Sequence, residues 1–165
     1  LPRAIIWAPW RMSYVTGDKP TASGCVFCDA VTAGDDAAML VLHRGVHAYV
    51  IMNRYPYNNG HIMVVPYAHV PRLTDLPAEV GAEIVQLTSR TQDIIQQKMN
   101  PHGFNLGMNQ GSAAGAGIEE HLHMHLVPRW VGDTNFMPAI GETRVIPQDL
   151  HDTYALLKGG FTHDA

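Results

Sequence analysis

The sequence predicts an α+β domain built on an antiparallel sheet with one long helix. Short segments of apolar and β-branched residues outnumber segments with helical periodicity. The regular strand–helix–strand alternation that is typical of parallel sheets is not visible. The length of 165 residues fits one domain. We expect an N-terminal arm at 1–24, the domain itself at 25–130, and a C-terminal extension at 131–165 that packs on the same domain.

The first two strands are expected at 46–53 and 61–66. Both segments are apolar and rich in β-branched residues, and the loop between them, 54–60, contains Pro56 and Gly60. A short connection of this kind is typical of two antiparallel strands. This pair therefore forms the start of the predicted sheet.

The long helix is expected at 76–99. Apolar residues recur there at the spacing of one helical face, and Pro77 suits the first turn. Pro101 and Gly103 follow the pattern and end it. A helix of this length can cover one face of the sheet.

Three elements are expected after the helix. Residues 103–109 alternate as a strand does, and residues 121–128 read as a second strand. The tail carries only a weak helical pattern at 149–158. Strands therefore outnumber helices in the prediction.

Charge and hydropathy exclude several classes of protein. The formal net charge of -4 does not suit a general nucleic-acid binder, which would usually be basic. No run approaches the roughly 18 apolar residues that a membrane-spanning helix needs. The N-terminus lacks the pattern of a signal peptide. We therefore expect a cytoplasmic protein without a nucleic-acid or membrane partner.

Three histidines at two-residue spacing dominate the segment "HLHMHLVP": His121, His123 and His125. In a strand they share one face, and the apolar residues between them face the core. Coincidence is a weak explanation for three histidines in register. The pattern suits either a three-histidine metal site or a nucleophilic histidine that its neighbours orient.

The segment before the histidines, "NQGSAAGAG" (109–117), is rich in glycine. Glycines let the backbone approach a ligand closely, and consecutive N–H groups can bind an anion. Such a loop is by itself more often only a turn. Directly beside the histidines, however, it indicates chemistry on phosphorus.

Cys25 and Cys28 form a close pair in "CVFC". Such a pair is rarely a structural disulfide and indicates half of a metal site or a redox pair. A redox pair is disfavoured because no βαβ pattern surrounds it. Two buried thiols without a metal are the other alternative. His69 and His121 are candidates for the two further ligands of a tetrahedral zinc.

These segments together resemble the histidine-triad (HIT) family of nucleotide hydrolases and transferases. Residues 121–127 match its pattern of three histidines separated and followed by apolar residues. The resemblance extends through "NRYPYNNGHIMVVP" (53–66), the helix and "GFNLGMNQG" (103–111). The continuation "EEHLHMHLVPRWVGDTNFMP" resembles the branch of the family that contains diadenosine tetraphosphate phosphorylases. The resemblance covers roughly residues 25–130 and implies a HIT-like fold.

The resemblance implies roles for individual residues. His123 would attack the α-phosphate of a nucleotide and form a nucleotidyl-histidine, His125 would orient it, and His61 would lie beside it. Asn53 would contact the ribose. Phosphates would be held by Asn109, Gln110, Gly111, Ser112, Gly115 and Gly117.

The resemblance also implies one structural zinc per chain, on Cys25, Cys28, His69 and His121, and a homodimer. Many members carry Ser or Thr where this chain has Ile118. The corresponding hydroxyl is therefore either absent or supplied by Ser112.

The implied activity is cleavage of a nucleotide phosphoanhydride, such as diadenosine tetraphosphate, with phosphate or water as the acceptor. Phosphate is the favoured acceptor. The alternatives are a purine nucleoside phosphoramidate or polyphosphate hydrolase, a nucleotide sensor with low turnover, and an enzyme whose triad binds a catalytic metal.

Overall fold

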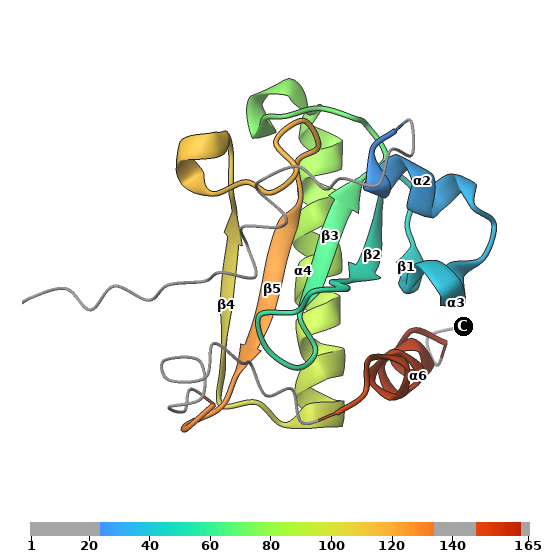
Figure 1. Cartoon of the computed structure of the whole chain (residues 1–165), viewed down its shortest axis with the longest axis vertical. Coiled ribbons are helices and arrows are strands. Elements are labelled where there is room, and N and C mark those ends of the chain that lie inside the picture. Colours follow the sequence, from blue (N-terminus) through green and yellow to red (C-terminus); the bar gives the residue numbers. More distant parts are fainter. Residues whose placement is uncertain (1–23, 134–147, 163–165) are drawn as a thin grey trace, which may run out of the picture.

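The predicted α+β fold is confirmed by the computed structural model, which describes residues 24–133 and 148–162. Five strands form one antiparallel sheet in the order β1-β2-β3-β5-β4 (Figure 1). The strands are β1 Val41–Arg44, β2 Ala48–Met52, β3 Ile62–Pro66, β4 Gly103–Met108 and β5 Met124–Arg129. The helices are α2 Val26–Thr32, α3 Asp36–Met39, α4 Ala78–Met99 and α6 Leu150–Phe161, with 3-10 turns η1 Leu73–Asp75 and η2 Ser112–Ala114.

The structure describes only part of the predicted N-terminal arm and of the predicted C-terminal extension. Of the N-terminal arm at 1–24, only Gly24 is described. In the C-terminal extension, 134–147 and 163–165 lie outside the described residues. The described end of the extension, helix α6, packs against α4 and β1. No helix in the described ranges is long and apolar enough to cross a membrane.

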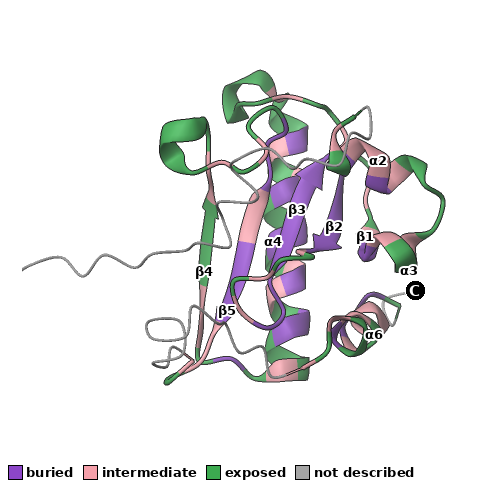
Figure 2. Cartoon of the chain, viewed as in Figure 1, coloured by how far each residue is buried: buried purple, intermediate pink, exposed green. Residues whose placement is uncertain are grey.

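Helix α4 lies behind the sheet in Figure 1 and covers one of its faces. Its buried stripe packs on residues that point to this face from β2, β3 and β5. Figure 2 shows β2 and β3 as the most buried strands. The buried residues between α4 and the sheet form one apolar cluster. It contains Val50, Val64, Ile84, Ile95, Leu126 and Leu157, among others. The opposite face of the sheet is therefore the one left for a site.

A second apolar cluster lies apart from the α4 cluster. It joins Phe27 of α2 to Tyr49 of β2 and Met63 of β3. The hydroxyl of Tyr49 donates to the carbonyl of Phe27 at 2.8 Å, which fixes α2 to the sheet. Ile118 packs against this cluster, which gives its apolar side chain a structural role.

Strand β1 and the helices α2 and α3 were absent from the prediction. Each is at most seven residues long, which is too short for a clear periodic signal. The pairing of β1 with β2 is also interrupted by a shift in register between Val41 and His43. The helix α4 begins at Ala78, and Pro77 is its N-cap and not part of its first turn.

The predicted strand at 121–128 begins later, because β5 starts at Met124. The backbone before Met124 forms other hydrogen bonds. The N–H of Leu122 donates to the carbonyl of Val70 at 2.7 Å, and the carbonyl of His121 accepts from the side chain of His123 at 2.8 Å. Only His125 of the three histidines lies within the ladder.

The two edges of the sheet differ. At β1, helix α6 covers the edge: Lys158 Nζ donates to the carbonyls of Val41 and Leu42, and Tyr154 Oη donates to that of Val41. At β4 half of the residues are exposed and none is buried (Figure 2), and Leu106 is 53% exposed. The β4 edge is thus the accessible one.

Candidate functional site

The three histidines gather on the sheet face opposite α4. His121 and His123 are buried, with relative exposures of 0% and 5%, while His125 is half-buried. The ring of Phe27 lies against the rings of His121 and His123, with centroids 5.4 and 4.9 Å away. Helix α2 therefore closes one side of the site and shields it from water.

His123 has one ring nitrogen fixed by the backbone. Its Nδ1 lies 2.8 Å from the carbonyl oxygen of His121. A carbonyl only accepts, so Nδ1 carries the proton and Nε2 keeps its lone pair in the neutral ring. Burial lowers the pKa of His123 and favours this neutral form. The side chain is thereby prepared as a nucleophile at Nε2.

His61 and His125 form a directed hydrogen-bonded pair. The backbone N–H of Tyr57 donates to His61 Nδ1 at 3.0 Å, so Nε2 of His61 carries the proton. This Nε2 lies 2.9 Å from Nδ1 of His125 and donates to it. The neutral His125 ring therefore holds its own proton on Nε2. Its ring centroid is 4.7 Å from that of His123, which places a ring N–H donor beside a ring nitrogen that keeps its lone pair.

His121 has a different set of neighbours. Its Nε2 donates to the carbonyl of Pro66 at 2.9 Å, so its Nδ1 keeps a lone pair. This Nδ1 lies 3.2 Å from Cys25 Sγ, 3.7 Å from Cys28 Sγ and 3.2 Å from His69 Nδ1. The four side chains place one ligand atom each within 4.8 Å of all the others.

These distances fit a tetrahedral metal site. Zinc bonds to sulfur and nitrogen imply ligand–ligand distances of about 3.3 to 3.8 Å in a tetrahedron. The distances from His121 Nδ1 are close to this range, and Cys28 Sγ lies 3.5 Å from His69 Nδ1. The structure therefore brings together the four predicted ligands in a group that could bind a metal.

The protonation of the cysteine pair also fits a cation site. Burial and the neighbouring Cys25 raise the pKa of the Cys28 thiol. Burial lowers the pKa of His121, and His69 and His123 contribute to this shift. A second thiolate is therefore unfavourable here until a cation stabilises it.

Asn53 stands at the start of the loop that carries His61. Its Oδ1 accepts from the N–H of Tyr55 at 2.9 Å, and its Nδ2 lies 3.3 Å from His61 Nδ1. The residue predicted to bind ribose thus adjoins the His61–His125 pair.

The predicted phosphate loop forms a compact turn around η2. Gly111 and Gly115 both have positive φ, at 81° and 80°, which glycine adopts without strain. The turn uses several of its own N–H groups, because Ala114 and Ala116 donate to the carbonyl of Gly111 and Gly115 donates to Ser112. Gln110 is held by Leu73, whose N–H donates to its Oε1 at 3.1 Å. The loop thus offers an anion fewer N–H groups than its composition suggests.

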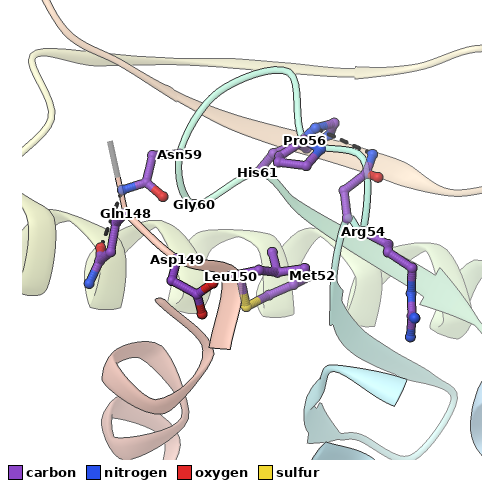
Figure 3. A pocket seen from close by; sticks show the side chains of 10 residues that line it. Met52, Arg54, Pro56, Asn59, Gly60, His61, Gln148, Asp149 and Leu150 are labelled. Carbon is purple, nitrogen blue, oxygen red and sulfur yellow. Dashed lines mark hydrogen bonds between the residues drawn. The ribbon is translucent and has the colours of Figure 1, made fainter. Parts of the chain in front are cut away.

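A cavity of about 390 Å³ lies on the other side of the 54–60 loop, next to the start of α6. Figure 3 shows the His61 side chain pointing away from Asp149 and Leu150. The buried Asn59 joins the loop to the start of α6, since its Nδ2 donates to Gln148 at 3.3 Å and its Oδ1 accepts from Thr153 at 3.2 Å. The cavity adjoins the histidine site, because Asn53 and His61 belong to the lining of both.

Comparison with known proteins agrees with this geometry. Residues 37–131, more than half of the chain, match the sequence model of the HIT domain. The chain belongs to the HIT family. It is 42% identical to the AP-4-A phosphorylase of Mycobacterium tuberculosis over 158 residues, which cover 92% of this chain and 81% of that protein.

Solved structures show the same HIT fold. A zinc-bound histidine triad family protein from Mycobacterium smegmatis is 29% identical, with a TM-score of 0.69 over 84% of this chain and 94% of that one. The diadenosine triphosphate hydrolase of Plasmodium falciparum is 21% identical, with a TM-score of 0.64 over 79% of this chain and 80% of that one. At this identity, the similarity to the P. falciparum hydrolase is one of fold alone.

Several residues of this HIT site were missed from the sequence. Tyr57 sets the tautomer of His61 through its backbone, and its ring lies 4.6 Å from that of His61 and 5.8 Å from that of His125. Asp133 holds the loop, because Asn58 donates to it at 2.7 Å and Arg129 forms a salt bridge with it. The polar cluster "YNN" before His61 was the only sequence signal for these contacts.

Proposed function

We propose that this HIT-family enzyme cleaves a dinucleoside polyphosphate by nucleotidyl transfer through His123. The observation that carries the proposal is the arrangement of tautomers. His123 keeps a lone pair on Nε2, and His125 beside it keeps a proton on its own Nε2. Nucleophile and hydrogen-bond donor are thus present together without a metal in either role.

In the first step Nε2 of His123 attacks the α-phosphorus of the substrate. A P–N bond forms while the P–O bond to the departing nucleotide breaks, and the departing phosphate oxygen leaves as an anion that accepts a hydrogen bond from His125 Nε2. His61 supports His125 by donating to its Nδ1. Since charge builds up on the phosphoryl oxygens, positioning and electrostatic stabilisation supply most of the catalysis.

In the second step an acceptor attacks the nucleotidyl-histidine and releases His123. A P–O bond to the acceptor forms while the P–N bond breaks, and its electron pair returns to Nε2 of His123, which restores the starting state. We propose inorganic phosphate as the acceptor. This choice is supported by the 42% identity to the M. tuberculosis protein named as an AP-4-A phosphorylase.

The test is a product analysis with diadenosine tetraphosphate, with and without inorganic phosphate. ADP plus ATP that appear only with phosphate are expected. AMP plus ATP in the absence of phosphate would mean that water is the acceptor. If neither tube shows turnover, the proposed substrate is wrong, and nucleoside phosphoramidates become the next substrates to assay.

We propose zinc as the metal of the Cys25, Cys28, His69 and His121 group, with one ion per chain and a structural role. Two thiolates and two neutral imidazoles complete a tetrahedral shell, which leaves no open position for a substrate. The ion would supply charge neutralisation for the thiolates. His69 would be oriented further by Glu120, whose Oε2 lies 4.0 Å from His69 Nε2.

We also propose a homodimer that forms through strand β4. The exposed backbone of an edge strand and the 53% exposed Leu106 support this choice. Leu106→Glu would place a charge in that contact, and sedimentation should then give the mass of a single chain. A dimer of unchanged stability in this variant would exclude the β4 edge.

A further inference from the structure

The proton on His61 Nε2 depends on the groups that reach the other ring nitrogen. The backbone N–H of Tyr57 donates to His61 Nδ1 at 3.0 Å, and Asn53 Nδ2 lies 3.3 Å from the same nitrogen. While Nδ1 accepts, the neutral ring keeps its proton on Nε2, which lies 2.9 Å from Nδ1 of His125. The position of one backbone N–H thus affects the protonation of two histidines.

This N–H belongs to the loop 54–60, which lies outside the ladders of the sheet. Asn58 anchors the loop to the end of β5. Asn59 anchors it to α6 and to the residues just before this helix. Its Nδ2 donates to Gln148 Oε1 at 3.3 Å (Figure 3), and its Oδ1 accepts from Thr153 Oγ1 at 3.2 Å. The loop is thereby joined to a helix far along the chain.

These contacts are not needed to place α6. Leu157 of this helix is buried in the α4 cluster, and Lys158 and Tyr154 bind carbonyls of β1. Asn59 and Thr153 are nonetheless buried, with relative exposures of 8% and 0%. Burial of an amide costs free energy that an apolar side chain of similar size would not cost. The polar pair therefore indicates a requirement of the loop, because hydrogen bonds fix an orientation that packing alone does not.

We propose that Asn59 is a positioning residue: bound to α6, it holds its loop where the N–H of Tyr57 meets His61 Nδ1. The effect on turnover rests on the proposed function. If the loop shifts, the single proton of the neutral His61 ring can move to Nδ1, and Nε2 then accepts from Nδ1 of His125. The neutral His125 ring in turn has no proton on Nε2, so it cannot donate to the departing oxygen.

Thr153→Val tests this inference, because it keeps the shape of the side chain and removes the hydroxyl. Thr153→Ser is the conservative variant that should restore the contact. Tyr154→Phe is the matched control, since it removes a hydroxyl from the next residue of the same helix, where the partner is a carbonyl of β1. Thr153 Oγ1 also lies 2.9 Å from the carbonyl of Asp149. Asn59→Ala is therefore a second test variant, which leaves this helix contact intact.

The first measurement needs no substrate. Nitrogen NMR of the histidine rings, at a pH where they are neutral, separates the two tautomers. In Thr153→Val and Asn59→Ala the Nδ1 and Nε2 resonances of His61 should move toward each other, as exchange with the second tautomer averages them. Thr153→Ser and Tyr154→Phe should keep the resonances of the unmodified protein. Unchanged His61 resonances in either test variant, or an equal change in Tyr154→Phe, would overturn the inference.

The second measurement is the turnover of diadenosine tetraphosphate with phosphate. Thr153→Val and Asn59→Ala should lower kcat at least threefold and leave KM nearly unchanged, because the alignment of the donor is lost while Asn53 still binds the substrate. Thr153→Ser should restore kcat, and Tyr154→Phe should retain it. A kcat equal to that of the unmodified enzyme, or an equal loss in Tyr154→Phe, would refute the role in the reaction.

Failure of the two proposals can be told apart. An unmodified protein that does not turn over diadenosine tetraphosphate would refute the proposed function. The His61 resonances of Asn59→Ala would still decide whether Asn59 sets the tautomer of His61.

Discussion

His121 and His125 lie at the two ends of the histidine row and have different hydrogen-bond partners. At one end, His121 is fully buried, donates from Nε2 to a backbone carbonyl and directs Nδ1 at two cysteines and a histidine. At the other end, His125 accepts at Nδ1 from His61 and is half-buried. We call these the metal end and the reacting end.

The difference shows that the hydrogen-bond partner of one ring nitrogen decides whether the other nitrogen carries a proton or a lone pair. A backbone carbonyl fixes the proton of His121 on Nε2, and another backbone carbonyl fixes the proton of His123 on Nδ1. In His125, Nδ1 accepts a hydrogen bond from His61 and therefore carries no proton. Under the proposed function, histidines at equal spacing in one segment would serve, in order, as a metal ligand, a nucleophile and a hydrogen-bond donor. Three predictions probe this division, and a fourth concerns a histidine outside the row.

The largest effect is expected at the centre of the row. His123→Asn removes the attacking nitrogen, and turnover of diadenosine tetraphosphate should fall by at least about 10³-fold, as for other lost nucleophiles. Binding measured by calorimetry should persist, because the loop and Asn53 are intact. Turnover within tenfold of the unmodified enzyme would refute the nucleophile assignment.

The next effect separates the two ends. His125→Ala removes the proposed hydrogen-bond donor to the departing oxygen, so kcat should fall by about 10²-fold, as for the loss of one such donor elsewhere. Metal content, measured by elemental analysis, should equal that of the unmodified protein because His125 is not in the ligand group. Loss of metal in His125→Ala would mean that the row acts as one metal site.

A change at the metal end should act mainly on stability. Cys28→Ser and His69→Ala should release zinc and lower Tm by at least about 5 °C, since one kcal/mol corresponds to about 2–4 °C for a chain of this size. A chelator should lower the Tm of the unmodified protein in the same direction. His47→Ala, at an exposed histidine outside the group, is the control and should retain the metal. Full zinc content in His69→Ala would exclude it as a ligand.

The smallest effect is expected at a histidine outside the row. Burial lowers the pKa of His43, with Arg90 and Lys158 contributing. The unfolded chain therefore binds a proton more readily at this residue. The contribution of His43 to stability is present above about pH 6.5 and is lost as pH falls below this value through the lowered pKa of the folded state.

The variant His43→Gln isolates this contribution. Its unfolding free energy should depend less on pH between about 7.5 and 5 than that of the unmodified protein, by less than about 1 kcal/mol because the side chain is partly exposed. Denaturant titrations at several pH values measure this difference. Identical pH dependence in the two proteins would contradict the assigned cause.

Long periodic segments of the sequence were sufficient to predict most of the fold. The helix expected at 76–99 and the strand pair around the 54–60 loop are present with small changes in their ends. Strand β1 and helix α2 were missed because a few residues carry little periodicity, and because the cysteines of α2 indicated metal binding and not a helix.

The site was predictable in its residues but not in its protonation. The spacing of the histidines and the cysteine pair named most of the groups that the structure brings together. The tautomers depend on Pro66 and Tyr57, whose backbone groups reach the site only through folding.

The contacts of Lys158 and Tyr154 with the carbonyls of β1 limit how copies of this chain can associate. A sheet with two open edges can add further sheets on both sides and grow into a fibre. Among the residues that the structure describes, α6 occupies the β1 edge, which leaves β4 as the edge that can accept a partner strand. Two copies that join through β4 leave no free edge between them, and such growth stops at a pair.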